Sequence, residues 1–171
     1  MGLRRRREER REERQVFGRG GTATQYQMRQ KILSIGDDYW IENAEGQRVY
    51  RVDGKALRLR HTLDLEDADG AKLCRVQTRV MHIRDTMDID GPDGERLARV
   101  HKALITPDLE IHGNVVDHEY QIEANNRKIA EISKKWFRVR DTYGVEISPD
   151  QPPVLILAVT IAIDSMAHPA R

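Results

Sequence analysis

One long apolar segment, residues 153–163, stands near the end of a predominantly polar chain. Its sequence, PVLILAVTIAI, contains one hydroxyl group and no charge. A helix that crosses a bilayer needs about 20 apolar residues, so this segment is too short to do so, and Asp164 closes the apolar run. A segment that is apolar on all sides is typically buried. The pattern therefore predicts that the rest of the chain surrounds it.

The segment could form a final buried strand or a helix. Several of its residues are β-branched, which favours a strand. However, it lacks the alternation of a strand, it is long for one, and it continues through Ala167. Asp150 is a candidate N-cap residue, and prolines are tolerated in the first turn of a helix. We therefore expect a buried helix over about 153–167.

An internal repeat with an offset of 24 residues precedes this segment. The aligned copies are residues 41–52, 65–76 and 89–100, with a fourth version at 120–132. Each copy has two strand patterns separated by a turn signal. The turns fall at Gly46, Gly70 and Gly94 in the first three copies and at Asn125-Asn126 in the fourth. Glycine allows the positive φ that such turns require, so the repeat predicts four β-hairpins.

The segments that link these hairpins also resemble one another, which adds further strands. They are residues 56–62, 80–86 and 136–142. Residues 102–117 depart from the repeat, and Pro107 and Gly113 indicate an irregular hairpin there. The spacing of strands and turns is typical of an all-β domain. We expect a mainly β fold with about twelve short antiparallel strands.

Each expected strand has one apolar face, because its apolar side chains recur at every second position. A closed antiparallel barrel would bury that face and would remove the exposed edges of the sheet. A barrel of this size is too wide for its own side chains to fill. The hydrophobic C-terminal helix would fill it, and the small inward residues Cys74, Ala98 and Ala130 would make room for the helix.

Charge divides the chain into an arm and a body. The formal net charge is +1, but residues 1–14 hold seven arginines and four glutamates, which leaves the rest slightly acidic. We predict a disordered or weakly helical basic arm at 1–23 and a body at 24–171. The single cysteine excludes an intramolecular disulfide, and the charged start does not resemble a secretory signal. Both observations favour a cytoplasmic protein, either free or attached peripherally to a membrane.

The sequence contains no recognisable catalytic constellation. It has neither a glycine-rich phosphate loop of the Walker type nor a nucleophile elbow. His112 and His118 lie beside acidic residues, but their spacing matches no common metal-ligand pattern, so we interpret them as surface histidines of a loop. The acidic turns that begin at Asp64 and Asp88 lack the distal glutamate of a calcium loop. We therefore expect no enzyme, no metal site and no cofactor.

One group of basic residues is a candidate binding site for phosphate oxygens. Strand parity places several of them on the outer face of the linking strands, and two lysines adjoin the last of these strands. The candidate residues are Arg58, Arg60, Arg84, Lys134, Lys135, Arg138 and Arg140. If these strands are neighbours, the side chains form a basic stripe. The alternative is a solvated face balanced by Asp64, Glu66 and Asp88 on the same side.

Several motifs of the chain resemble those of the LURP-one-related family. They are Tyr26-x-Met28, Asp53-Gly54-Lys55, the turn at 67–70 and above all the block from Ser133-Lys134-Lys135-Trp136-Phe137 to Tyr143-Gly144-Val145. The resemblance covers about 24–167. It implies the tubby C-terminal-like fold, in which a twelve-stranded barrel surrounds a hydrophobic C-terminal helix. The same superfamily includes phospholipid scramblases and phosphoinositide-binding tubby domains, but their lipid and calcium motifs are not reproduced in this sequence.

Two functions fit these observations. The first is a non-enzymatic binding module that recognises anionic phospholipid headgroups or another phosphate-bearing ligand, with the arm strengthening attachment to an acidic membrane surface. The second is a protein-interaction or scaffold domain, in which the charged arm recruits a partner. The near-neutral net charge offers no drive toward nucleic acid, so we expect no specific nucleic-acid partner.

Overall fold

The computed structural model of the protein describes residues 2–29, 38–54, 62–78, 86–101, 104–106, 109–136 and 142–168. These residues form two helices and twelve strands. The helices are α1 (Gly2–Val16) and α2 (Pro153–Ala167). The strands are β1 (Thr24–Arg29), β2 (Tyr39–Asn43), β3 (Arg48–Gly54), β4 (Thr62–Asp67), β5 (Lys72–Thr78), β6 (Thr86–Asp90), β7 (Arg96–His101), β8 (Leu104–Thr106), β9 (Leu109–Asn114), β10 (Glu119–Ala124), β11 (Arg127–Ser133) and β12 (Thr142–Ile147).

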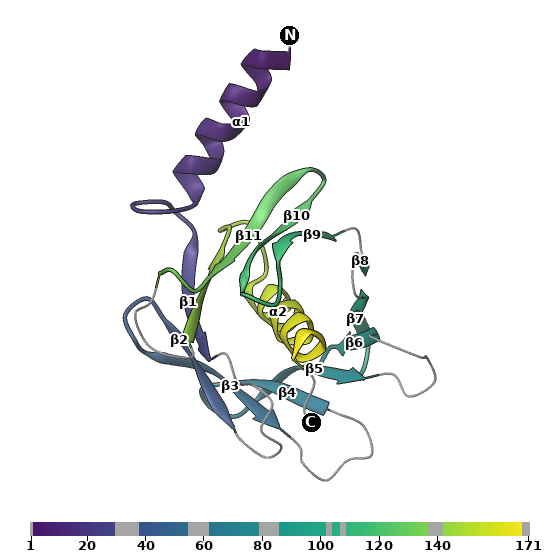
Figure 1. Ribbon diagram of the computed structural model, residues 1–171. Coiled ribbons are helices and arrows are strands. Elements are labelled where there is room, and N and C mark those ends of the chain that lie inside the picture. Colours follow the sequence, from purple (N-terminus) through teal and green to yellow (C-terminus); the bar gives the residue numbers. More distant parts are fainter. Residues whose placement is uncertain are drawn as a thin grey trace.

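The strands form one antiparallel sheet that surrounds α2 (Figure 1). Every strand from β2 to β12 pairs with its neighbours in sequence, and β1 pairs with both β2 and β12. The expectation of a mainly β, antiparallel fold with a C-terminal helix is confirmed. The shortest ladders, of two residue pairs each, join β1 to β2 and β8 to β9.

The 24-residue repeat corresponds to three hairpins, β2–β3, β4–β5 and β6–β7. Their turns use Gly46, Gly70 and Gly94 at φ values of 75°, 86° and 82°, as the turn signals predict. The register of each hairpin shifts next to the turn, between residues 41 and 42, 65 and 66, and 89 and 90. The irregularity therefore recurs with the same offset as the sequence. The fourth hairpin, β10–β11, turns at Asn125 and Asn126, which also have positive φ.

Helix α2 occupies the interior of the sheet and is buried on all sides from Ile156 to Ser165. It packs against β5, β6, β7 and β12. Two of the predicted small residues, Cys74 on β5 and Ala98 on β7, are buried on these strands, so the helix lies against the wall where the side chains are small. No helix among the described residues has the length and apolar character needed to span a bilayer.

The start of α2 differs from the prediction. The N-cap position is Pro152, which has no side-chain capping bond, and not Asp150. Asp150 instead accepts a hydrogen bond from the Ser148 hydroxyl at 2.6 Å and forms an ion pair with Arg127. The prediction failed because α2 begins at Pro153, so Asp150 lies two positions before the N-cap. Pro153 begins the helix, where a missing backbone N–H carries no penalty.

The outer faces of β4 and β6 are buried, in contrast to the solvated face that parity suggested. Asp64, Glu66 and Asp88 alternate with interior residues, yet they are only 1%, 7% and 5% exposed. Each carboxylate pairs with an arginine of a neighbouring strand, and the long arginine side chain covers it. The expectation that these acidic side chains lie in solvent is therefore wrong.

Candidate functional site

Most of the predicted basic stripe lies outside the described residues. Arg58, Arg60, Arg84, Arg138 and Arg140 all belong to this group. Of the predicted stripe, Lys134 and Lys135 are described, and they lie directly after β11. The structure therefore does not place the stripe as a whole, and its grouping remains a prediction.

Lys134 and Lys135 lie beside a carboxylate, Glu119 at the start of β10. The Lys134 backbone N–H donates to Glu119 Oε1 at 3.0 Å, and Ser133 Oγ donates to the same carboxylate. The Lys135 ammonium is 3.3 Å from Glu119 Oε2, and its side chain is 80% exposed. A pair this exposed contributes little stability, so the Lys135 ammonium can turn toward another anion at small cost.

Three arginines of the outer face form a ladder of ion pairs with the same 24-residue spacing as the repeat. Arg51 pairs with Glu66 at 2.6 Å, Arg75 with Asp64 at 2.6 Å, and Arg99 with Asp88 at 2.7 Å. Hydrogen bonds to these carboxylates raise the pKa of all three guanidinium groups. Since each arginine is held by an acid, the ladder serves the fold and adds no open basic surface.

Helix α1 carries a different set of arginines. In an α-helix, successive side chains are about 100° apart. Five exposed arginines therefore fall within a sector of about 140°, and four glutamates fall within the opposite sector. The arginines are Arg6, Arg7, Arg10, Arg11 and Arg14, and the glutamates are Glu8, Glu9, Glu12 and Glu13. Among the described residues no ion pair is recorded for these arginines. The helix thus has one basic face.

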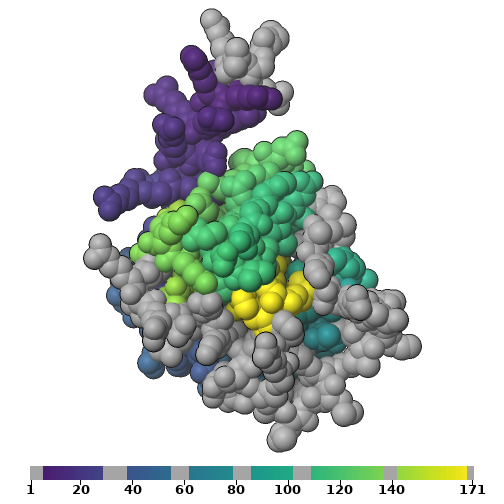
Figure 2. Space-filling view, viewed as in Figure 1, coloured from purple at the N-terminus to yellow at the C-terminus, as the bar shows by residue number. Residues whose placement is uncertain are grey.

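The end of α1 is attached to the sheet. Glu13 Oε1 is 2.6 Å from the Lys128 ammonium of β11, and that ammonium lies over the ring of buried Phe17 at 4.7 Å. The Gly18 backbone N–H donates to Glu146 Oε2 of β12 at 3.0 Å. Figure 2 shows α1, in purple, projecting from the body. The last turn of α1 and the residues just after it are thus fixed to β11 and β12.

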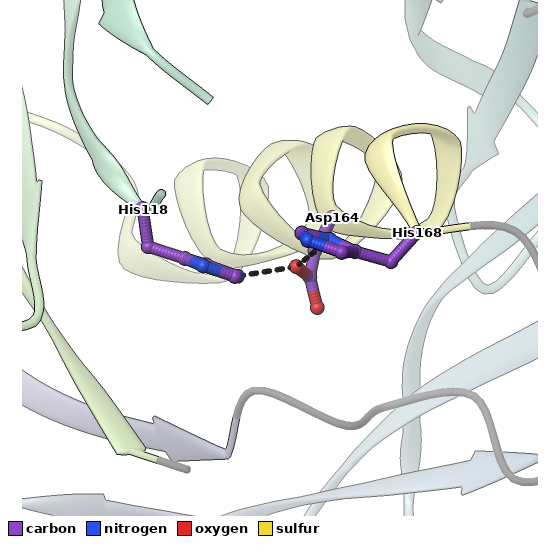
Figure 3. Close-up of side chains that lie close together, drawn as sticks. All are labelled: His118, Asp164 and His168. Carbon is purple, nitrogen blue, oxygen red and sulfur yellow. Dashed lines mark hydrogen bonds and ion pairs between the residues drawn. The ribbon is translucent and has the colours of Figure 1, made fainter. Parts of the chain in front are cut away.

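The two histidines interpreted as surface residues differ in position. His112 on β9 is exposed, and its Nε2 atom is 3.2 Å from Glu110 Oε2. His118, in the turn between β9 and β10, is 1% exposed and lies against Asp164 of α2 (Figure 3). The interpretation of His118 as a surface residue is therefore wrong. His168, just after α2, completes a group of three side chains around the Asp164 carboxylate.

Sequence reasoning missed this interior group for a specific reason. Asp164 marked the end of the apolar run, but the helix continues to Ala167 and keeps Asp164 inside the sheet. The available signal was the pair Asp164 and His168, whose i,i+4 spacing places both side chains on one helix face. His118 is 46 residues away in sequence, so no local pattern connects it to the other two.

The fold defines a class of protein in which an antiparallel sheet surrounds a hydrophobic C-terminal helix. The LURP-one-related family model matches residues 24–164, so the chain belongs to the LURP-one-related family. A crystal structure of an Arabidopsis thaliana protein is similar, with a TM-score of 0.67 over 85% of this chain and 92% of that one. Its sequence identity is 13%, so the likeness concerns the fold, which is tubby-like. Among curated proteins no sequence matches this chain.

Proposed function

We propose that this protein is a non-enzymatic binding module that attaches to anionic phospholipid headgroups through the basic face of α1. The observation that supports this function is the separation of charge on that helix. Glu13 points to the body through its contact with Lys128. Arg7 and Arg11 are directed about 120° and 160° away from Glu13 around the helix axis. These two arginines therefore point away from the sheet, where a membrane surface can reach them, whereas Arg10 and Arg14 line a groove between α1 and the body.

The expected strength of attachment is modest. A basic residue close to an anionic membrane surface contributes about 1 kcal/mol, so five arginines set an upper limit of about 5 kcal/mol. The glutamates on the opposite face reduce this value, but they lie on the side of the helix farther from the membrane. The attraction falls off over a Debye length of about 8 Å at physiological salt. Binding should therefore weaken steeply as salt is added.

Residues of the body would extend the same surface. Lys135 is exposed and weakly paired, and the stripe predicted from Arg58, Arg60, Arg84, Arg138 and Arg140 would add further arginines. We also propose that the sheet closes into a barrel of twelve strands, which would provide a rigid base for the arm; the pairing of β1 with both β2 and β12 supports closure. Attachment of this kind would act at the cytoplasmic face of a membrane, where anionic lipids are concentrated.

Sedimentation with lipid vesicles tests the proposed function. The full chain should sediment with vesicles that contain phosphatidylserine and should remain in solution with pure phosphatidylcholine vesicles. The double variant Arg7→Glu/Arg11→Glu should lose most of this binding. The control Arg48→Glu/Arg96→Glu changes the net charge equally at exposed positions at the starts of β3 and β7, and it should bind almost as well as the natural protein.

Two results would contradict lipid attachment. Equal sedimentation with neutral and anionic vesicles would mean that charge is not the cause. An equal loss in the two double variants would mean that net charge matters but the α1 face does not. If the natural protein binds neither vesicle, while removal of residues 1–12 abolishes capture of a defined protein partner, the scaffold function is the better explanation.

A further inference from the structure

The C-terminal part of α2 holds a buried carboxylate inside the sheet. The Asp164 side chain is 1% exposed and projects from a helix whose neighbouring residues, such as Ile161 and Ile163, are buried. Its Oδ1 atom is 2.5 Å from His118 Nε2 and 3.2 Å from His168 Nδ1 (Figure 3). The two imidazole rings are stacked, with centroids 5.1 Å apart and planes 7° from parallel.

Several buried polar atoms around this carboxylate have no hydrogen-bond partner within the described part of the chain. They are Asp164 Oδ2, His118 Nδ1, Ser165 Oγ and the hydroxyl groups of Tyr39 and Tyr143. Buried polar groups are normally paired, and a group of unpaired ones indicates an occupant such as an ion or water. The Tyr143 side chain belongs to the same region, because its ring centroid lies 4.4 Å from that of the His118 imidazole.

The β9–β10 turn places the His118 side chain against α2. His118 has a φ of 53°, in the left-handed region, where histidine, like asparagine and aspartate, occurs more often than most other residues. The turn therefore accepts a histidine, and its imidazole lies against the Asp164 carboxylate.

The three side chains suit a metal ion in chemistry and in spacing. Each offers one ligand atom, and these atoms lie within 4.8 Å of one another. Histidine nitrogen and aspartate oxygen bind Zn²⁺ at about 2.0–2.2 Å, with three protein ligands and an open fourth position in many sites. A bound ion would move the His118 and Asp164 atoms apart from their present 2.5 Å. His168 follows the last turn of α2 and is 33% exposed, which leaves a route for an ion from solvent.

We propose that His118, Asp164 and His168 bind a divalent transition-metal ion of the zinc class. The ion would replace the hydrogen bonds between the imidazoles and the carboxylate, and it would balance the buried negative charge of Asp164. It would also connect the C-terminal end of α2 to the β9–β10 turn. Such a site is independent of the lipid-binding face, because α1 contributes no ligand to it.

Metal content and Co²⁺ binding test the site. The full chain, produced in zinc-supplemented medium and purified without a metal-affinity step, should contain about one zinc ion per chain by elemental analysis. After treatment with a chelator, Co²⁺ should restore the site and should give visible absorption bands. Asp164→Asn and His168→Ala should each weaken Co²⁺ binding by at least about tenfold, a loss that even indirect partners of a metal can cause.

His112→Ala is the matched control, because His112 belongs to the same hairpin but is exposed and lies beside Glu110. It should bind Co²⁺ like the natural protein. Since Asp164→Asn could disturb folding, circular dichroism should check that this variant is folded. The His168→Ala variant changes the partly exposed end of the site, so it tests metal binding with less risk to the fold. The proposal is overturned if the natural protein holds no zinc and binds no Co²⁺, or if all three variants bind Co²⁺ equally.

Discussion

A charge introduced at Ala158 tests whether the interior around α2 excludes water, because a charge in such a place should strongly destabilise the fold. Ala158 is fully buried in the middle of the helix, between Leu157 and Val159, which are also fully buried. Burial in such a place raises the pKa of a carboxyl group by about 3–5 units. Each unit corresponds to about 1.4 kcal/mol, so the ionised form of the introduced group costs about 4–7 kcal/mol. A domain of this size is stable by about 5–15 kcal/mol, so Ala158→Asp should remove much of the stability at neutral pH.

The pH dependence of stability separates the effect of the introduced charge from the effect of the larger side chain. The folded-state pKa of the introduced carboxyl group is raised above its unfolded value of about 3.9. The penalty is therefore absent below that pH and grows as pH rises toward the folded-state pKa. Ala158→Asn is the matched control, because it has the same size and no ionisable group. Urea unfolding at neutral and mildly acidic pH compares the two variants. If Ala158→Asp unfolds at the same urea concentration as the natural protein at neutral pH, α2 does not lie in a dry interior.

Three further predictions follow from the same structure. Burial and the nearby Asp64 raise the pKa of Cys74 to about 12, so its thiol should not react with a disulfide reagent at mildly alkaline pH until the protein is unfolded; rapid reaction in the folded state would contradict its burial. Ala98→Leu adds bulk on β7, one of the strands against which α2 packs, and should lower the free energy of unfolding by about 1–3 kcal/mol. Leu97→Ala, on the exposed side of β7, should change the free energy of unfolding little. Equal effects of the two variants in urea unfolding would refute the packing of α2 against β7. The Ser148 hydroxyl and the Arg127 guanidinium hold the pKa of Asp150 in the folded protein below its ordinary value. The contact therefore stabilises the fold slightly at a pH above the pKa of Asp150 in the unfolded chain, and this stabilisation is lost as pH falls through the pKa in the folded protein. Asp150→Asn should remove this part of the acid dependence of thermal unfolding, and an unchanged acid dependence would argue against the contact.

The hairpins could be predicted because the information for them is local. A turn that needs positive φ selects glycine or asparagine within a few residues, and Gly46, Gly70, Gly94 and Asn125 hold these positions in the structure. Alternation of apolar residues then assigned the interior face, and Val52, Cys74 and Val100 are buried as expected. The C-terminal helix was predictable for a similar reason, because its apolar run is too long for a strand and lacks alternation.

The charged contacts could not be predicted in the same way. Parity placed Asp64 and Asp88 on the outer face, but it could not show that Arg75 and Arg99 would fold over them and exclude solvent. Such burial depends on the register between neighbouring strands, because a shift of one residue would move each side chain to the other face of the sheet. The N-cap prediction at Asp150 failed because the apolar run does not show at which residue the helix begins, and α2 begins only at Pro153.

The sequence by itself determined the hairpins, the interior face of the strands and the apolar helix near the end of the chain, because each depends on residues a few positions apart. Only the tertiary structure decided which polar groups meet inside the sheet. Asp164 ends the apolar run in the sequence, yet the helix carries it into the interior, where His118 approaches from the β9–β10 turn. Such a contact depends on how deeply α2 enters the sheet, and that depth is set by packing over the whole molecule.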